Sequence, residues 1–179
     1  MFDETSIPTI ETERLVLRGW RAADVAPLSA IYSDPQVATW LGWPSPDQVE
    51  ASMGRWVEHW RRHGFGLWAL EEKSSGALIG RVGLMNQVDW TASEQDAEVG
   101  WTLARSAWSN GYATEGATAA LDFARAKGLR RIISITRPDN LRSQAVMKRL
   151  GLTYRGATHW HGYDQVWFGT ELEIGEVAQ

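Results

Sequence analysis

Near the middle of the chain, a carboxylate on an expected strand is followed by a turn of small and polar residues, and the two could do chemistry together. Residues 96–103 read D-A-E-V-G-W-T-L, with apolar side chains at every second position, which is typical of a buried strand. Glu98 lies on this strand. A glutamate beside a reacting nucleophile can take its proton, so Glu98 is a candidate general base.

The turn that follows, W-S-N-G-Y-A-T at residues 108–114, is typical of an anion site. It leads into a helix, because alanines recur at helical spacing up to Lys127 and Gly128 follows where a C-terminal cap belongs. A helix start carries about half a positive charge and free backbone N–H groups, which together suit phosphate. Gly111 has no Cβ, so a pyrophosphate could approach the main chain there. The alternative is that Gly111 only permits a turn.

Two common nucleotide-binding loops are missing from the sequence. Neither G-x-x-x-x-G-K-[ST] nor G-x-G-x-x-G occurs. The sequence therefore disfavours ATP, GTP and NAD as the ligand of this turn.

The turn resembles the acetyl-CoA signature of the GNAT superfamily of N-acetyltransferases, Q/R-x-x-G-x-G/A. Trp108 stands at the first position of that signature, Gly111 at the fourth and Ala113 at the sixth. A tryptophan at the first position departs from the general pattern but is similar to the branch that includes the ribosomal-protein N-terminal acetyltransferases. Residues 12–18, T-E-R-L-V-L-R, resemble the opening of that branch. Residues 140–152, N-L-R-S-Q-A-V-M-K-R-L-G-L, resemble the family's second motif, N-x-x-S-x-x-V-M-x-x-L-G-F.

The elements that must position these residues can be read along the chain from hydrophobic periodicity and cap residues. In order, the sequence predicts a strand in 11–20, a helix in 24–32 broken at Asp34-Pro35, a helix from Ser45 to His63, a hairpin of 65–72 with 77–85, a loop at 86–95, the central strand and helix, a strand at 130–136, a helix from Asn140 to Gly151, and a hairpin of 153–160 with 165–172 through residues 161–164.

Three of these boundaries rest on specific cap residues. Ser45 is the expected N-cap of its helix, with Gln48 completing a capping box, and Gly64 ends that helix. Asn140 is a natural N-cap of the second-motif helix. The strand-helix-strand unit in the centre is a right-handed crossover, so its two strands should be parallel.

The resulting order of elements is similar to the GNAT fold, an α/β fold with a mixed sheet flanked by helices. The resemblance implies an opening between the two parallel central strands, where the pantetheine arm of acetyl-CoA bonds one strand like an extra strand. It implies that Trp101, Thr102 and Leu103 bond the pantetheine, and that a pyrophosphate cradle is formed by Trp108, Ser109, Asn110, Gly111, Tyr112, Ala113 and Thr114. Asn140 is expected to bond the cofactor as well, although capping alone would explain it.

The reaction implied by the resemblance is direct attack of an amine on the thioester carbonyl. A lysine amine has a pKa of roughly 10.4 and an α-amino group one near 8, so the amine must first lose a proton. Glu98 falls near the catalytic glutamate of the histone-acetylating members, and its alternative role is structural. Asp96 is a weaker candidate base. His159 and His161 share one face of the last hairpin, but without a partner carboxylate they are expected to be surface residues and not a metal site.

A general acid would return a proton to the departing thiolate. Many family members use a tyrosine on the second-motif helix, and Met147 stands there in this chain. Ser143 is the substitute that the sequence offers. A thiol pKa of about 8.5 makes the thiolate a good leaving group, so the acid should matter less than the base.

Composition limits the remaining function classes. A chain of 179 residues with 44% hydrophobic and 22% charged residues is predicted to be one domain, residues 1–179. Net charge is −4 and no basic tract occurs, so direct nucleic-acid binding is not expected. There is no cysteine, no apolar stretch long enough for a membrane, and no signal-peptide pattern, so cytoplasmic location is the default expectation. Most of the eleven tryptophans should fill the core, and a few in one cleft could stack on a substrate.

The leading hypothesis is therefore an acetyl-CoA-dependent N-acetyltransferase that uses no metal. A module that binds acyl-CoA without catalysis is the alternative from another class, and an enzyme for a longer acyl chain is a third. Both a protein N-terminal α-amine and a small-molecule amine stay open as the acceptor, and the negative net charge suits a cationic one. The sequence also leaves open whether the chain forms a homodimer.

Overall fold

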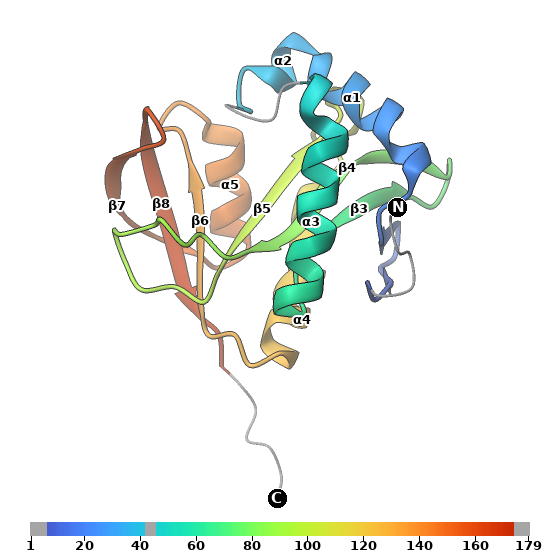
Figure 1. Ribbon diagram of the computed structural model, residues 1–179. Coiled ribbons are helices and arrows are strands. Elements are labelled where there is room, and N and C mark those ends of the chain that lie inside the picture. The colour runs from blue at the N-terminus through green and yellow to red at the C-terminus, as the bar shows by residue number, and fades with distance from the viewer. Residues whose placement is uncertain (1–6, 42–45, 174–179) are drawn as a thin grey trace, which may run out of the picture.

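The computed structural model describes residues 7–41 and 46–173, which form one mixed sheet of eight strands with helices on both faces (Figure 1). The strand order is β1-β2-β3-β4-β5-β6-β8-β7. The strands are β1 (Ile10–Glu11), β2 (Leu15–Arg18), β3 (Leu67–Glu72), β4 (Ala77–Met85), β5 (Ala97–Leu103), β6 (Arg131–Thr136), β7 (Thr153–Trp160) and β8 (Tyr163–Glu171). The helices are α1 (Val25–Ser33), α2 (Pro35–Ala38), α3 (Val49–His63), α4 (Tyr112–Ala126) and α5 (Leu141–Arg149), with short 3₁₀ turns at Ala22–Asp24, Pro46–Gln48 and Arg105–Ala107.

The sheet consists of two antiparallel parts joined at one short parallel contact. Strands β1 to β5 form the first part, and β6, β8 and β7 form the second. Between them, β5 and β6 pair in parallel only at Ala97↔Ile132 and Glu98↔Ile133. Beyond these pairs the two strands draw apart, as Figure 1 shows. The parallel pairing predicted from the crossover is confirmed, and the divergence creates an opening in the middle of the sheet.

The two faces of the first part are covered by different helices. Helix α4 lies on one face, where Gly116 lets it approach Val82 of β4. Its buried residues are Gly116, Ala117, Ala120, Leu121 and Ala124, one side of the helix. Helix α1 and the first half of α3 cover the opposite face, where Tyr32 and Trp56 surround Arg81 of β4. Consequently Arg81 lies between the sheet and these helices and is only partly exposed.

The first predicted strand was wrong as a single element. Residues 11–20 contain a tight turn, because both the main-chain N–H and the hydroxyl of Thr12 donate to the carbonyl of Leu15. The chain therefore folds back as the short hairpin of β1 and β2. Leu15 and Leu17 are fully buried on one face, as their alternation predicted.

Three further boundaries differ from the prediction or extend it. The chain breaks at Asp34-Pro35 as expected, but Asp34 then caps a new helix, α2, by accepting from the N–H of Gln36. Ser45 lies outside the described residues, and Gln48 stands at the N-cap position of α3. The last hairpin turns at residues 161–162 alone, both with positive φ, as in a type I′ turn.

The predicted helix ends are confirmed. Gly64, Gly128 and Gly151 follow α3, α4 and α5 with φ of +70°, +77° and +81°. These left-handed positions favour glycine because it has no Cβ.

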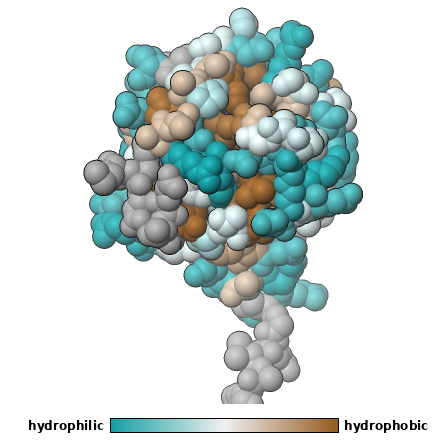
Figure 2. Space-filling model, turned by 90° about the vertical axis from the view of Figure 1, so that its right-hand side faces the viewer, coloured by the Kyte–Doolittle hydropathy of each residue, from teal (hydrophilic) through white to brown (hydrophobic). Residues whose placement is uncertain are grey.

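The surface is mixed in character. On the side of the molecule shown in Figure 2, hydrophilic residues predominate and hydrophobic residues form separate patches between them. Within the described ranges, no helix is both long and apolar enough to cross a membrane.

Candidate active site

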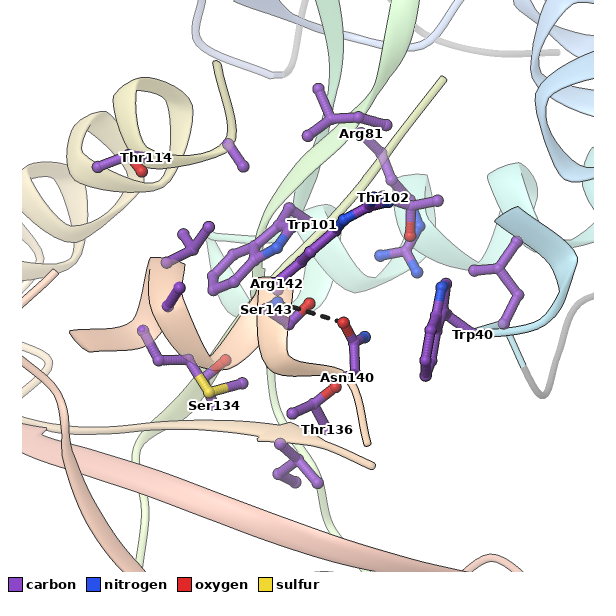
Figure 3. A pocket seen from close by; sticks show the side chains of 18 of the residues that line it. Trp40, Arg81, Trp101, Thr102, Thr114, Ser134, Thr136, Asn140, Arg142 and Ser143 are labelled. Atoms are coloured by element: carbon purple, nitrogen blue, oxygen red, sulfur yellow. Dashed lines mark hydrogen bonds between the residues drawn. The ribbon is translucent and has the colours of Figure 1, made fainter. Parts of the chain in front are cut away.

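A cleft of about 1350 Å³ occupies the place where β5 and β6 separate. Most of the predicted site residues line it: Glu98, Trp101, Thr102, Leu103, Trp108, Ser109, Gly111, Tyr112, Ala113, Thr114, Asn140 and Ser143. Figure 3 shows Trp101 and Thr102 on β5 across from Asn140 and Ser143 at the start of α5. Of the predicted cradle, Asn110 is not among the lining residues. Instead its side chain donates to the carbonyl of Trp108 (3.2 Å), within the turn itself.

The main chain of β5 presents unpaired groups to the cleft. The N–H of Ala104 donates to the carbonyl of Ile79 (2.8 Å), which fixes the phase of the β4–β5 ladder. In an antiparallel ladder the direction of the backbone groups alternates, so Trp101 points its N–H and C=O away from β4. Because the β5–β6 pairing ends at Glu98↔Ile133, these groups of Trp101 face the opening and could pair with an extended ligand.

The neighbours of Trp101 on β5 offer less main chain to a ligand. The carbonyl of Leu103 already accepts a hydrogen bond from the Trp108 indole (3.0 Å), which leaves its N–H. Thr102 directs its main chain towards β4 by the same alternation, so its side chain is what it offers to the cleft.

The turn before α4 supplies an anion-binding helix start. Gly111 is the N-cap of α4 and has φ of +82°, and Ser109 has φ of +64°. The main-chain N–H of Glu115 donates to the carbonyl of Gly111, and it is the first N–H of α4 to make such a bond. The N–H groups of Tyr112, Ala113 and Thr114 precede it and are the free donors of a first helical turn. All three residues line the cleft, so the helix start is directed at the space that a phosphate would occupy.

Arg14 holds this turn from outside. It donates to the carbonyl of Asn110 (2.9 Å) and forms an ion pair with Glu115 in the first turn of α4 (2.6 Å). Its guanidinium also lies over the ring of Tyr112, 4.7 Å from the centroid. Burial opposes ionisation of Glu115, but the bonds from Thr12 and Arg14 hold the pKa of its carboxyl below the usual value. The turn is therefore fixed by residues of the β1–β2 hairpin.

The surroundings of Glu98 shift the pKa of its carboxyl group. It lines the cleft, half-buried, and accepts a short hydrogen bond from the side-chain amide of Gln87. Burial raises the pKa of the Glu98 carboxyl, and this outweighs the opposing effects of the Gln87 bond, the charge of Arg81 and the Ile135 N–H. A raised pKa makes Glu98 a stronger base than an ordinary glutamate.

The other candidate bases have structural partners. The carboxylate of Asp96 accepts from the N–H groups of Arg130 (2.7 Å) and Arg131 (2.9 Å) and is not among the lining residues. His159 bonds Asp164 (2.9 Å) and also lies outside the lining. His161 lines the cleft but bonds Asp89, which lies in the loop before β5. Both histidines are exposed at the surface, as predicted. Each nevertheless has a partner carboxylate, which the sequence did not reveal because the pairing depends on the hairpin turn and on a distant loop.

Within residues 7–41 and 46–173, no group of three or more His, Asp or Glu side chains could hold a metal ion.

The second motif places Asn140 and Ser143 together. Asn140 caps α5, as predicted, by accepting from the N–H of Ser143 (3.2 Å), the bond drawn in Figure 3. Ser143 also lines the cleft. Met147, one turn later, is only 1% exposed.

Sequence reasoning missed the other end of the cleft, which carries two arginines. Arg81 donates from Nε to the hydroxyl of Tyr32 (2.6 Å) and lies over the ring of Trp56. Arg137, directly after β6, donates to the carbonyl of Thr39 (2.7 Å). The only signal for Arg81 was a charged residue inside an otherwise apolar strand, and Arg137 gave none.

Arg137 is flanked by aromatic rings. Its guanidinium lies 4.9 Å from the ring centroid of Trp40 and 5.7 Å from that of Tyr163. Both rings line the cleft, as does Trp56. Trp20, Trp60 and Trp68 are buried in the core, as predicted, whereas stacking of a cleft tryptophan on a substrate stays a prediction.

Comparison with known proteins places this arrangement in a family. The family model described as an acetyltransferase (GNAT) domain matches residues 14–153. A Bacillus subtilis protein named as an uncharacterized N-acetyltransferase, YoaA, is 26% identical over 160 residues, covering 87% of this chain and 89% of the relative. The crystal structure of an acetyltransferase from Agrobacterium tumefaciens, 27% identical, superposes with a TM-score of 0.77 over 91% of this chain and 94% of its own. RimL, a ribosomal L7/L12 α-N-protein acetyltransferase solved with coenzyme A, is 18% identical and shares the fold with a TM-score of 0.76 over 94% of this chain and all of its own (100%).

Proposed function

The chain belongs to the GNAT acetyltransferase family, and we propose that it transfers the acetyl group of acetyl-CoA to a primary amine by direct attack within a ternary complex. One observation carries the proposal. The unpaired main chain of Trp101 and the free N–H groups at the start of α4 line the same cleft, 1350 Å³ in volume, where two parallel strands separate.

The residues of the cleft fit acetyl-CoA in two places. The N–H groups of Tyr112, Ala113 and Thr114 can bind the pyrophosphate at the positive end of α4. The N–H and C=O of Trp101 can bond the amides of the pantetheine arm in the manner of a neighbouring strand. Asn140 faces the same space from α5. The bound thioester supplies an activated acetyl carbonyl, which an amine can attack without further activation.

Glu98 acts as the general base in this proposal. It takes a proton from the acceptor ammonium, and the free amine then attacks the carbonyl carbon. The C–N bond forms as the C–S bond breaks, and the thiolate leaves with the electron pair. The extra proton on the new amide nitrogen passes to water, and the thiolate is protonated in turn. Gln87 fixes the direction of the Glu98 carboxylate through its hydrogen bond. Ser143 lines the cleft and can return a proton to the thiolate, a minor contribution because that thiolate is already stable.

The test separates binding from catalysis. Titration calorimetry with CoA should give measurable heat without added metal, and the melting temperature should rise with CoA concentration by mass action. Thiol release from acetyl-CoA should then appear with at least one member of an amine panel. Absence of both heat and thermal shift at millimolar CoA would refute the proposal. Tight binding without thiol release on any amine would favour the non-catalytic module.

A further inference from the structure

The face of β4 and β5 that lies under α1 and α3 has three cross-strand rows. Arg81 pairs with Thr102, Gly83 with Gly100, and Met85 with Glu98. Side chains two residues apart on a strand share a face, so Arg81 and Glu98 point to the same side of the sheet. The middle row has no side chains at all. A Cβ built on Gly100 would meet no atom within 4 Å, so the space above Gly100 is open, whereas one built on Gly83 would meet the carbonyl oxygen of Gly66 at 2.2 Å.

Gly100, which lines the cleft, is the floor of a slot with opposite functional groups at its ends. Glu98 and Thr102 are four residues apart on β5, about 13 Å along the strand. Both Glu98 and Arg81 have long side chains that shorten the gap. The charge of Arg81 acts on the Glu98 carboxyl, which places the two within electrostatic reach. The slot can therefore hold one small molecule between a base and a guanidinium.

Arg81 has donors left for a ligand. Its Nε is used by Tyr32, and its cation faces the ring of Trp56. Among the described residues, no hydrogen bond uses its two terminal nitrogens, which form the forked end of the guanidinium. A guanidinium fork matches a carboxylate in geometry and charge. In Figure 3 the end of Arg81 extends past Thr102 in the direction of Trp40, into the pocket.

Arg137 adds a second positive charge at this end. It lies beside Trp40, and its Nε is buried without a hydrogen-bond partner among the described residues. Asp139 is 3.7 Å from that nitrogen but is 71% exposed, where its charge is screened by water. Among the lining residues the only acids are Glu98, a single carboxylate against these two arginines, and Glu115, which Arg14 neutralises. The acceptor end of the cleft is thus positive although the whole chain is negative.

We propose that the acceptor is a small molecule of the amino-acid class, with its amine at Glu98 and its carboxylate at Arg81. This inference rests on the proposed function. A purely cationic acceptor would place its remaining positive charge against two arginines. A free amino acid, by contrast, matches both ends of the slot, and Tyr32 and Trp56 close the slot behind Arg81.

The test compares amino acids with the same compounds lacking the acid. Thiol release is measured for the twenty free amino acids, γ-aminobutyrate, their carboxamides, and short peptides beginning with Asp or Glu. The expected result is a preference for at least one free acid over its carboxamide, about 10- to 100-fold in kcat/KM, the usual effect of one charged hydrogen-bonded pair. Equal rates for acid and carboxamide, or a preference for peptides or for polyamines such as spermidine, would overturn the inference while leaving the acetyltransferase proposal intact.

Variants connect that preference to Arg81. Arg81→Gln should remove most of the preference by raising KM for the acid, with little change for the carboxamide or in CoA affinity. Arg81→Lys should restore part of it, since the charge returns without the fork. Arg125→Gln, on the exposed side of α4 where Arg125 pairs with Asp122, is the matched control. A preference that survives Arg81→Gln in a folded protein would contradict the assignment.

A binding measurement keeps the inference testable if catalysis is absent. Calorimetry of the preferred free amino acids against the CoA-bound protein should show binding that Arg81→Gln weakens. If thiol release fails on every amine but this binding is found, the acceptor assignment stands and the enzyme proposal fails. If no amino acid binds and none reacts, the acceptor assignment fails as well.

Discussion

Arg14 forms an ion pair with Glu115 at 2.6 Å, across a sequence separation of 101 residues. The same guanidinium bonds the carbonyl of Asn110, directly before Gly111. The anion-binding turn therefore depends on a residue of the β1–β2 hairpin. Since the free N–H groups of α4 bind a ligand only when correctly aimed, the pair should matter for CoA affinity as well as for folding.

Replacing Arg14 tests this dependence. Arg14→Ala should weaken CoA binding several-fold and lower the melting temperature modestly, because Arg14 is partly exposed and its charge is screened by solvent. Calorimetry and thermal unfolding give the two values. Arg125→Ala, which breaks an exposed pair on the same helix, should change neither. Unchanged CoA affinity for Arg14→Ala would show that the turn holds its shape alone.

The Glu98 base can be tested through the pH dependence of the rate. Glu98→Gln should lower kcat at neutral pH by about 10²- to 10⁴-fold, the usual range for loss of a general base. The deficit should shrink at high pH, where the amine is already deprotonated, and CoA affinity should stay close to wild type. Ser143→Ala should have a smaller effect. A wild-type pH profile for Glu98→Gln would move the base role to a water chain or to His161.

Glu98 should also affect how the stability of the folded protein depends on pH. Because burial raises the pKa of Glu98 in the folded state, the folded protein binds this proton more tightly than the unfolded chain does. The destabilising effect of the ionised Glu98 carboxylate on the fold is absent below the unfolded pKa near 4.3. It develops as pH rises through the pKa of the folded state. Glu98→Gln should therefore be more stable than wild type at pH 7 and equal to it near pH 4, as measured by thermal unfolding.

Asp96 is the matched control with the opposite sign. Its pKa is lowered, since the N–H groups of Arg130 and Arg131 and the charge of Arg131 outweigh burial. Its stabilising effect is present above the unfolded pKa near 3.9 and is lost as pH falls through the folded value. Asp96→Asn should be less stable than wild type at pH 7, with the difference fading in acid. The same sign for Asp96→Asn and Glu98→Gln would contradict this account.

Two variants of Gly111 distinguish the effect of backbone strain from the effect of blocking the ligand. At φ of +82°, a valine would be strained whatever the space around it, although its Cβ would meet only Nη2 of Arg14 at 3.4 Å. Gly111→Val should therefore lower both stability and CoA affinity. Asparagine tolerates this conformation, so Gly111→Asn should keep most of the stability and still lose affinity. Full CoA affinity in a folded Gly111→Asn protein would limit Gly111 to forming the turn.

Local patterns in the sequence predicted what short-range physics determines. Alternation located β5, and caps such as Asn140 and Gly128 located the helix ends, because a few neighbouring residues decide each of these. The hairpin hidden at residues 11–20 was missed, since its turn rests on a single threonine bonding Leu15. The crossover rule gave the parallel strands, and the resemblance gave the opening between them.

The acceptor end of the cleft could not be predicted because it depends on register between distant strands. Nothing near Arg81 in the sequence says that it pairs with Thr102, and that pairing is what places its side chain on the same face of the sheet as Glu98. Likewise Arg137 adds its charge to the acceptor end only because the fold brings it beside Trp40, a residue distant in the sequence. The sequence's net charge of −4 suits a cationic acceptor but is too small to decide, whereas the two arginines at this end of the cleft favour an anionic group on the acceptor.

Gly100 offers the sharpest test of where the acceptor lies. A Cβ there would meet no atom within 4 Å, and its side chain direction is into the slot between Glu98 and Arg81. Gly100→Val should therefore fold with a melting temperature near that of wild type, since a β-branched residue also suits a strand. CoA affinity should change little, because the pantetheine-facing main chain belongs to Trp101. The KM for the acceptor should rise at least about tenfold, the loss expected when a well-packed contact of roughly 1.4 kcal/mol is blocked, and Gly100→Ala should have an intermediate effect. Steady-state kinetics at saturating acetyl-CoA measure the acceptor KM, and calorimetry measures the CoA affinity. An unchanged acceptor KM in Gly100→Val would place the acceptor elsewhere in the cleft, and a loss of CoA affinity alone would mean that the cofactor, not the acceptor, occupies the space above Gly100.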